Sequence, residues 1–407
     1  MAESKLMSLF RDKINKSKNT DIKEANFDIM YPTGFLTLDY LNGTTVHVKS
    51  DSMDMNYDSV GIMDGSSNLF ISRSGTGKST LVVQIIGNLL RQYPDSVAYI
   101  DDIEGSLPIS RKEFLLGLSE EELKNRVFMR NSGITTENVY DQIRLIYDIK
   151  MENRSQYEYD TGKYDIYGER IYKLIPTFYF IDSLALLMPN DVMEDDEIGS
   201  NMTGSSVAKQ NTALIKKISQ LLKSANIILF TINHILDDIQ IGFIPKPQQI
   251  AGLKQGERIP GGRTMLYLAN NMFRLDEKSL LKESEGYGIN GSVVDITIVK
   301  SRTNASRRSV PLVFDKSNGG FDNILSILHF LKTEGLIGGA GKSMYFNSNP
   351  EAKFSMRGFK EQLNSDIELQ KAFSIATKEA VQQMLSDTKV QESAHDTFDI
   401  NQSILSI

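Results

Sequence analysis

Residues 69–80 read LFISRSGTGKST and place a short apolar run directly before a glycine-rich loop. The apolar run, 68–71, predicts a buried strand, and Leu81, Ile85 and Leu89 beyond the loop have the spacing of an amphipathic helix. This arrangement follows the phosphate-loop pattern G-x-x-x-x-G-K-[ST], although Ser72 occupies the position of its first glycine. We therefore predict that the loop binds the phosphates of a nucleotide.

In such a loop, backbone N–H groups and the dipole of the following helix bind phosphate oxygens. We expect Lys78 to reach the β- and γ-phosphates and the Ser79 hydroxyl to complete the ligand shell of Mg²⁺. The predicted nucleotide-binding residues are Ser74, Gly75, Thr76, Gly77, Lys78, Ser79 and Thr80. The alternative is a glycine-rich turn in which Gly-Lys-Ser occurs by chance. The sequence GGAGKS at 338–343 is interpreted as such a turn, in a hairpin, because it follows a helical pattern rather than a strand.

The composition is that of a globular protein. The chain has 407 residues, 45 Lys and Arg against 52 Asp and Glu, and a formal net charge of −7. No apolar run is long enough for a transmembrane helix, and the N-terminal MAESKLMSLFRDK lacks the apolar core of a signal peptide. We therefore expect a soluble, unexported, cytoplasmic protein of two or three domains, with no membrane partner.

The residue counts also exclude several kinds of chemistry. The absence of cysteine excludes disulfides, thiolate metal sites and cysteine nucleophiles, and four scattered histidines do not predict a histidine metal cluster. The negative net charge argues against non-specific coating of nucleic acid. A local basic groove remains compatible with it, because counterion release depends on the phosphates that are contacted.

Short apolar runs alternate with helical patterns from about residue 45 to 320, which is typical of an α/β fold with a mostly parallel sheet. The predicted strands are Asn68–Ile71, Val97–Asp101, Thr177–Asp182, Asn226–Ile232, Asn271–Leu275 and Val293–Val299. Residues 153–173, rich in tyrosine and charge, predict an inserted β-ribbon. Residues 237–262 are polar and have no helical period, and a loop of that length inside a compact domain is usually functional.

The same patterns divide the chain into four parts. Residues 1–30 predict a short helical arm, and residues 31–320 predict the large α/β core. Residues 321–386 predict a small C-terminal α/β domain that begins with a helix over 323–334, and residues 387–407 predict a flexible tail.

Acidic residues follow two of the predicted strands, and the C-terminal ends of parallel strands form the ligand-binding edge of an open α/β sheet. Asp182 ends the apolar run TFYFID and is predicted to hold Mg²⁺ together with Ser79; a helix N-cap is the alternative. The run VAYIDDIE at 97–104 supplies Glu104, predicted to orient or deprotonate the attacking water, with Asp102 supporting the loop. Surface acids after a strand are the alternative there.

The order of these motifs resembles that of the RecA-type ATP-dependent DNA recombinases, most closely the UvsX-like branch of phages. The segment YPTGFLTLDYLNG resembles the family segment before the ATPase core, and the phosphate loop, the D-x-E acids and the strand FIDS follow in the family's order. ILFTINH at 228–234 resembles the strand whose polar end senses the γ-phosphate. Pro260-Gly261-Gly262 resembles the end of the second DNA-binding loop, and VKSRT at 299–303 resembles the strand whose two cations reach a neighbouring subunit's nucleotide.

The resemblance covers roughly residues 30 to 345 and includes departures. Ser72 replaces the first glycine of the loop, and residues 153–173 and an enlarged segment at 44–65 are additions. The family's adenine-stacking tyrosine has no clear counterpart, Phe114 being the nearest aromatic residue.

The resemblance implies a RecA-like P-loop ATPase core, ATP and Mg²⁺ as cofactors, and a DNA-dependent ATPase of recombination and repair, in the host cytoplasm if a phage encodes it. Lys78 and Glu104 would act within one subunit, while Lys300 and Arg302 would stabilise transition-state charge in the neighbouring subunit. His234 would report the γ-phosphate. Solvated strand-end charges and a core histidine are the alternatives.

It further implies two DNA-binding loops, near 191–206 and 237–262. The candidate DNA-binding residues are Met202, Gly204, Ile241, Phe243, Lys246, Lys254, Arg258, Gly261 and Gly262. Cations would contact phosphates, and an apolar side chain such as Ile241 or Phe243 would part stacked bases. The arm would pack on the next subunit through Leu6 and Phe10, four residues apart. Expected partners are single- and double-stranded DNA, further copies of the chain in a helical filament that catalyses strand exchange, a single-strand-binding protein and a loading mediator.

Two other functions remain open. A hexameric helicase motor on the same core fold would need a separate N-terminal helical domain, for which residues 1–30 are too short. A non-hydrolysing filament or mediator protein would be consistent with Ser72, but the phosphate-loop lysine and the two acids oppose it.

Overall fold

The computed structural model describes 28–105, 107–194, 203–237, 252–260, 266, 269–284, 286–304 and 306–386. The predicted N-terminal arm with Leu6 and Phe10, the predicted tail, and the candidate DNA-binding residues Met202, Ile241, Phe243, Lys246, Gly261 and Gly262 lie outside these ranges.

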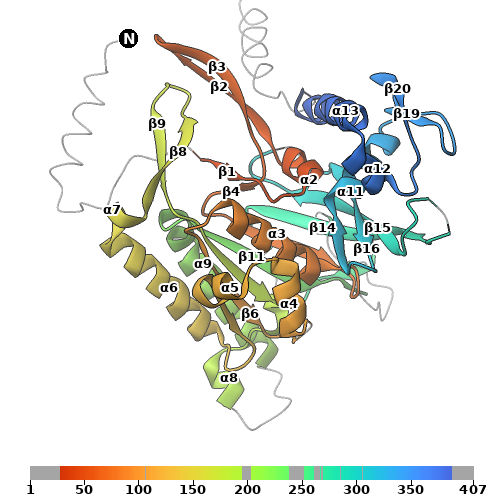
Figure 1. The fold of residues 1–407 in the computed structure, drawn as a ribbon. Coiled ribbons are helices and arrows are strands. Elements are labelled where there is room, and N and C mark those ends of the chain that lie inside the picture. The colour runs from red at the N-terminus through yellow and green to blue at the C-terminus, as the bar shows by residue number, and fades with distance from the viewer. Residues whose placement is uncertain are drawn as a thin grey trace, which may run out of the picture.

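A nine-stranded sheet forms the centre of the molecule (Figure 1). Its strands are, in spatial order, β17 (Gly320–Asp322), β16 (Ser309–Asp315), β15 (Gly291–Lys300), β14 (Asn271–Leu281), β5 (Ser67–Ser72), β11 (Ile227–His234), β10 (Thr177–Asp182), β6 (Val97–Asp102) and β7 (Val127–Arg130). The strands from β14 to β7 are parallel, whereas β15, β16 and β17 extend the sheet in antiparallel fashion. The predicted α/β class with a mostly parallel sheet is confirmed.

The six predicted strands all lie in this sheet, and five of them differ from the observed strands by at most two residues at either end. The prediction that a strand begins at Asn226 is wrong. Asn226 has a left-handed backbone (φ 49°), and its side chain donates to the Leu174 carbonyl (2.6 Å), so the strand begins at Ile227. Strand β14 continues to Leu281, well beyond the predicted end at Leu275, because its second half pairs only with β15.

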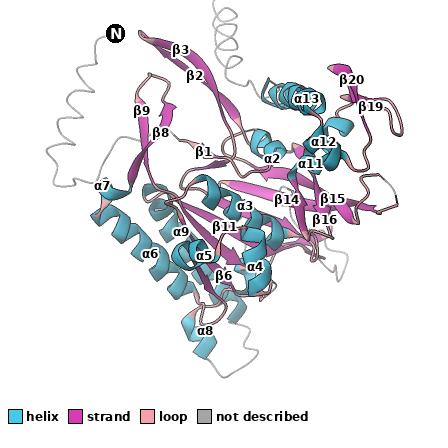
Figure 2. Cartoon of the chain, viewed as in Figure 1, coloured by secondary structure: helices cyan, strands magenta, loops and turns pink. Residues whose placement is uncertain are grey.

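Helices cover both faces of the sheet (Figure 2). The helices are α2 (Leu36–Leu41), α3 (Lys78–Gln92), α4 (Ile109–Leu116), α5 (Glu120–Arg126), α6 (Thr136–Glu152), α7 (Arg154–Tyr157), α8 (Asn190–Glu194), α9 (Thr203–Ser224), α11 (Asn323–Thr333), α12 (Phe359–Ser365) and α13 (Ile367–Ser386), with a 3₁₀ turn at Leu184–Leu186. In β5, Phe70 belongs to the core with α3, whereas Leu69 and Ile71 belong to the core with α6 and α9. This alternation follows from the two-residue period of a strand that is buried on both faces.

Two β-ribbons extend from the end of the sheet at which the parallel strands β5 and β10 begin (Figure 1). The predicted ribbon within 153–173 is confirmed as β8 (Glu158–Tyr164) paired with β9 (Arg170–Leu174). The enlarged segment at 44–65 contains a second ribbon, β2 (Thr44–Ser50) and β3 (Met53–Ser59), which the sequence reasoning did not predict. The ribbons contact each other, since the Tyr57 hydroxyl donates to the Tyr164 carbonyl (2.9 Å).

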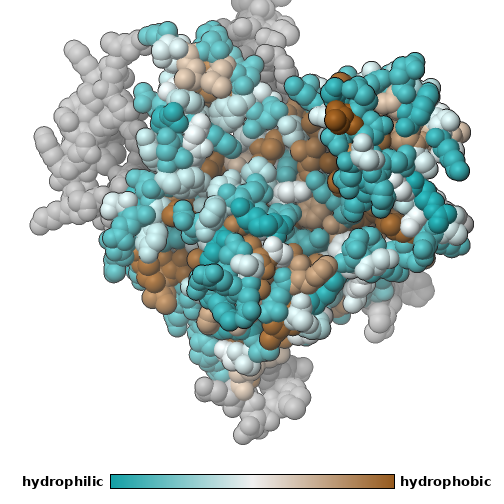
Figure 3. All heavy atoms as spheres, viewed as in Figure 1, coloured by the Kyte–Doolittle hydropathy of each residue, from teal (hydrophilic) through white to brown (hydrophobic). Residues whose placement is uncertain are grey.

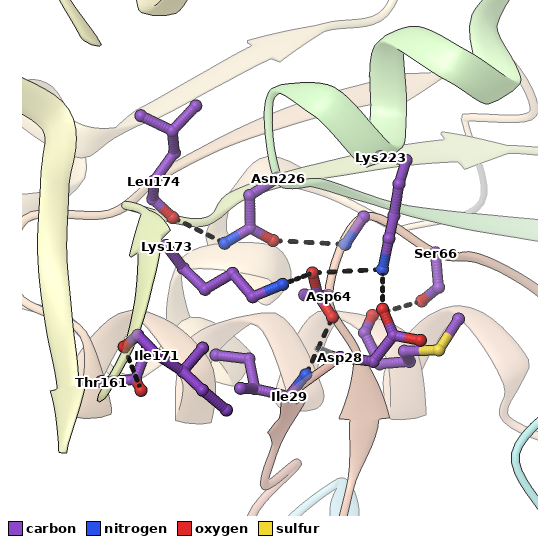
Figure 4. Close-up of polar contacts among 12 residues, drawn as sticks. Asp28, Ile29, Asp64, Ser66, Thr161, Ile171, Lys173, Leu174, Lys223 and Asn226 are labelled. Atoms are coloured by element: carbon purple, nitrogen blue, oxygen red, sulfur yellow. Dashed lines mark hydrogen bonds and ion pairs between the residues drawn. The ribbon is translucent and has the colours of Figure 1, made fainter. Parts of the chain in front are cut away.

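A buried carboxylate anchors the β8–β9 ribbon (Figure 4). Asp64 accepts hydrogen bonds from the Ile29 N–H (3.0 Å), the Lys173 ammonium of β9 (2.8 Å) and the Lys223 ammonium of α9 (3.3 Å). Lys223 also pairs with Asp28. Removing one partner of a buried ion pair typically costs about 3–5 kcal/mol, so the ribbon base is firmly held.

The C-terminal segment packs onto the core through α11. A three-stranded sheet of β18 (Ile337–Gly338), β19 (Met344–Phe346) and β20 (Asn349–Phe354) follows that helix. Phe346, Phe354 and Phe359 belong to the same hydrophobic cluster as Phe70. Gly338 pairs with Tyr345, which confirms that GGAGKS forms a hairpin turn and not a second phosphate loop. The division into domains at residues 30, 320 and 386 stays a prediction.

The remaining strands are β1 (Met30–Tyr31), β4 (Ile62–Met63), β12 (Leu236–Asp237) and β13 (Glu257–Arg258). In the YPTGFLTLD segment, Asp39 accepts hydrogen bonds from the Thr33 N–H (2.7 Å) and hydroxyl (2.6 Å), and Asn88 of α3 donates to the Thr33 carbonyl (2.9 Å). This segment therefore fastens the chain before the sheet to the helix after the phosphate loop.

The surface in Figure 3 is mostly hydrophilic, with hydrophobic side chains gathered over α6, where Leu145 and Ile149 are 52% and 42% exposed. No helix within the described ranges has the length and apolar character that a membrane crossing requires.

Candidate nucleotide-binding site

The loop between β5 and α3 has the backbone that a phosphate loop requires. Gly75 and Gly77 have φ angles of 80° and 91°, in the left-handed region that favours glycine. At Gly77 a Cβ would also lie 3.1 Å from the ring of Phe321. Ser72, in contrast, is still part of β5 and does not have a positive φ, so the backbone tolerates a side chain there. The serine at this position therefore causes no backbone strain at the start of the loop.

Lys78, the first residue of α3, points back to the end of β5. Its Nζ donates to the Ser72 Oγ (2.9 Å), the Arg73 carbonyl (3.2 Å) and, at 3.4 Å, the Ser72 carbonyl. Burial lowers the pKa of Lys78 to about 8, while the carboxylates of Glu104 and Asp182 act in the opposite direction. A triphosphate would supply negative charge beside this ammonium and favour its protonated form.

Asp182 and Glu104 lie together at the C-terminal ends of adjacent strands β10 and β6. Asp182 pairs with Asp102 in the strand register, and its carbonyl accepts the N–H groups of Ile103 (2.6 Å) and Glu104 (2.9 Å). The Asp182 side chain is buried. The backbone of this turn therefore fixes Glu104 next to the predicted magnesium ligand.

The donors Ser79 and Asp182 fit Mg²⁺, because hydroxyl and carboxylate oxygens are the ligands that this ion prefers. Within the described part of the chain, no group of three or more His, Asp or Glu residues could hold a metal by itself.

His234 ends β11, the strand between β5 and β10, and its Nε2 lies 3.1 Å from the Glu104 Oε2. Both side chains are partly exposed. The neighbouring Asn233 accepts from the His234 N–H (2.8 Å) and donates to the Pro260 carbonyl (2.9 Å). The strand end thus connects Glu104 to the segment around Pro260.

The two acids that precede Glu104 are engaged elsewhere. Asp101 forms a two-pronged ion pair with Arg130 (2.7 Å for both contacts) and accepts from the Tyr179 hydroxyl (2.6 Å). Asp102 pairs with the buried Lys112 and accepts from the Gly105 N–H (2.8 Å), as expected for a residue that supports the loop. Glu104 is therefore the acid of this trio that is available to a water at the site.

A cavity of about 320 Å³ lies against α3. Its lining includes Gln84, Arg91, Phe114 and Phe321. Phe321 also faces Gly77, and Phe114 is 61% exposed. Phe321 is therefore shared between this cavity and the surroundings of Gly77, whereas residues 72–79 do not line the cavity.

The structure does not bring Lys300 and Arg302 to this edge of the sheet. Lys300 pairs with Met272, which is level with Leu69 near the start of β5, and the Arg302 N–H donates to the Asn270 carbonyl (3.1 Å). Both cations therefore lie at the opposite end of the parallel strands from Lys78, roughly 10 Å or more away along the strand direction.

Part of the predicted DNA-binding loops is ordered as secondary structure. Gly204 lies in the first turn of α9 and residues 190–194 form α8, so helices occupy both ends of the loop that was predicted near 191–206. The ends of the second loop pair as β12 and β13. Arg258 is exposed, and Lys254 lies 3.5 Å from Asp276.

Sequence reasoning missed two ion-pair groups next to the loop. Arg73 pairs with Asp237 across the ends of β5 and β12. Arg274, buried in β14, pairs with Glu257 (2.6 Å) and Asp276 (2.7 Å). Comparison of the sequence with protein-family models and with curated proteins found no match, so the assignment of this site rests on its residues and geometry.

Proposed function

We propose that the chain is an ATP-dependent DNA recombinase with a RecA-like core, which hydrolyses ATP with Mg²⁺ and forms helical filaments on single-stranded DNA for strand exchange. One observation supports the ATPase activity: four predicted site residues lie together where neighbouring parallel strands end. These residues follow or end the strands β5 (Lys78), β11 (His234), β10 (Asp182) and β6 (Glu104). The order of sequence motifs supports the DNA part.

In this mechanism the loop N–H groups and Lys78 bind the β- and γ-phosphates. Ser79 and Asp182 would hold a magnesium ion, which would neutralise phosphate charge. Glu104 accepts a proton from the attacking water or orients it, and the contact with His234 fixes its carboxylate. Lys300 and Arg302 would act on the nucleotide of a neighbouring copy, an arrangement that their position at the far edge of the sheet favours.

The test is ATP hydrolysis with and without single-stranded DNA, combined with electron microscopy of the assemblies. We expect DNA-stimulated hydrolysis on extended filaments and loss of turnover in Lys78→Ala. Lys371→Ala, a change of an exposed side chain on α13, is the matched control. Closed rings would favour the helicase alternative, and filaments without hydrolysis would favour the structural or mediator protein. Either result would reject the proposal.

A further inference from the structure

Arg73 lies inside the phosphate loop, yet its side chain is bound to a residue from another part of the sheet. Its Nη2 lies 2.5 Å from the Asp237 Oδ1, and its Nη1 lies 3.2 Å from the Oδ2. The two side chains are 57% and 67% exposed. This is the two-pronged geometry in which a guanidinium binds a carboxylate or a phosphate.

The position of Asp237 follows from strand pairing. His234 is level with Ser72, and the Ile235 N–H donates to the Ser72 carbonyl (2.8 Å), so the chain after β11 stays beside the phosphate loop. Asp237 comes three residues after His234, in β12. A carboxylate is therefore held next to a loop built to bind phosphate.

The backbone of Arg73 contacts the ammonium of Lys78, the lysine that is expected to reach the phosphates. Its carbonyl accepts hydrogen bonds from the Lys78 Nζ (3.2 Å) and from the Thr76 hydroxyl (2.9 Å). A triphosphate in the loop would offer the Arg73 guanidinium more negative charge than one carboxylate does, and the same paired oxygen geometry.

The other strand of the β12–β13 pair is held differently. Arg274 binds Glu257 through two contacts, 2.6 and 3.0 Å, and both side chains are almost fully buried, at 6% and 5% exposure. A buried pair is costly to break, whereas an exposed pair is weak and exchanges readily with another anion. The tie between Arg73 and Asp237 is therefore the exchangeable one.

We propose that Arg73 is an additional ligand of the nucleotide's phosphates and that Asp237 competes with these phosphates for it. This inference rests on the proposed nucleotide binding. It adds a residue that the phosphate-loop pattern does not specify, and it makes Asp237 an internal competitor of the triphosphate. The alternative is that the pair only fastens β12 to the loop.

Three variants of the full-length chain separate these two roles by the sign of their effects. Asp237→Asn releases Arg73 and is expected to tighten ATP binding roughly three- to tenfold, whereas Arg73→Gln weakens it by a similar factor. In the double variant Arg73→Gln/Asp237→Asn there is no arginine for Asp237→Asn to release, so its ATP affinity should equal that of Arg73→Gln alone. Calorimetric titration measures the affinities for ATP and for AMP. The AMP affinity should be the same in all variants, because AMP has no β- or γ-phosphate.

A purely structural tie predicts that Arg73→Gln and Asp237→Asn change ATP affinity in the same direction, and this result would overturn the inference. Asp160→Asn, in the exposed Arg170–Asp160 pair of the ribbon, is the matched control and should leave affinity unchanged. Should Arg73→Gln fail to fold by circular dichroism, Arg73→Lys keeps the charge without the fork and is expected to give an intermediate loss.

A second measurement uses the absence of cysteine from the chain. A fluorophore on Leu236→Cys, in exposed β12, reports the release of Asp237. We expect ATP to shift its signal, and Asp237→Asn to produce that shift without ATP; an unshifted Asp237→Asn signal would contradict the exchange. Lys78→Ala separates the two proposals. If the wild type binds ATP and Lys78→Ala does not, nucleotide binding at the loop is supported, and the Arg73 and Asp237 variants then test only the role of Arg73. If the wild type binds no ATP, both proposals fail.

Discussion

The Nε2 of His234 lies 3.1 Å from the Oε2 of Glu104, although 130 residues separate them in the sequence. The contact joins the acid expected to handle the attacking water to the strand end that leads into the β12–β13 pair. On the same strand end, the Asn233 side chain accepts from the His234 N–H and donates to the Pro260 carbonyl, so hydrogen bonds run from Glu104 to the segment around Pro260.

Glu104→Gln is expected to leave ATP affinity within about threefold of wild type and to lower kcat by at least about 100-fold, because the amide cannot accept the water proton. Steady-state hydrolysis and calorimetric binding measure the two effects. Glu113→Gln, an exposed change on α4, is the matched control. Loss of binding together with turnover in Glu104→Gln would contradict the assigned role.

ATP affinity should fall as the pH rises above about 8. Burial lowers the pKa of Lys78 to about 8, so the free protein loses the Lys78 charge above that pH and ATP binding must then restore a proton. The dissociation constant is expected to rise up to about tenfold per pH unit between pH 8.5 and 9.5. Lys78→Arg stays charged in this range, and its affinity should therefore be flat; an equally steep profile would assign the effect to another group.

Ser72→Ala is expected to tighten ATP binding by about two- to fivefold, because the Lys78 ammonium must leave the Ser72 hydroxyl to reach phosphate. Ser72→Gly removes the same hydroxyl and adds backbone freedom to the end of β5. Equal affinities in the two variants would identify the hydroxyl as the cause. Weaker ATP binding in both would show instead that Ser72 positions Lys78 productively.

Arg302→Ala should depress DNA-stimulated hydrolysis and leave the nucleotide affinity of isolated subunits nearly unchanged, because Arg302 lies at the sheet edge opposite Lys78. Mixing provides a sharper test. Arg302→Ala subunits keep an intact loop, and Lys78→Ala subunits keep both cations, so mixed assemblies should regain part of the activity that each variant lacks alone. No recovery in the mixture, or an equal affinity loss in isolated Arg302→Ala subunits, would place the cations outside a shared site.

Asp39→Asn tests the segment that fastens the sheet to α3. Burial raises the pKa of Asp39 to about 7, although the hydrogen bonds from Thr33 and Gly34 act to lower it. The folded chain therefore binds more protons than the unfolded chain between pH 4 and 7, and this contribution to the free energy of unfolding is lost as the pH rises through 7. The change amounts to at most about 4 kcal/mol. Chemical denaturation at pH 5 and 8 should show a smaller pH effect in Asp39→Asn than in wild type or in exposed Asp58→Asn.

The sequence predicted those features that depend on local pattern. The run at 177–182 is apolar, preceded by Pro176 and ended by an acid, and β10 has the predicted bounds. The second half of β14 could not be predicted, because its polar sequence after Leu275 is stabilised only by pairing with β15. The β2–β3 ribbon was missed although its strands alternate, with Val46, Val48, Met53, Met55 and Tyr57 on one face and polar residues on the other, a pattern that the sequence analysis did not use.

In the candidate site, Glu104 and Asp182 could be placed near Lys78 because the C-terminal ends of parallel strands meet at one edge of the sheet, whereas His234 was predicted from the family resemblance. The pairings of Arg73 with Asp237 and of Arg274 with Glu257 could not be predicted. They depend on which strands are neighbours and on their register, and neither property is encoded in local spacing.

The separation of Lys78 and Lys300 along the parallel strands has a consequence for symmetry. If one copy donates the cations and the next supplies the loop, the contact joins two different surfaces, and a two-fold dimer cannot satisfy it. Such head-to-tail contacts leave one unfilled loop at one end of any open assembly and one unused pair of cations at the other. An open chain of copies would then have chemically distinct ends, and growth and disassembly would have a direction fixed by the fold of each subunit.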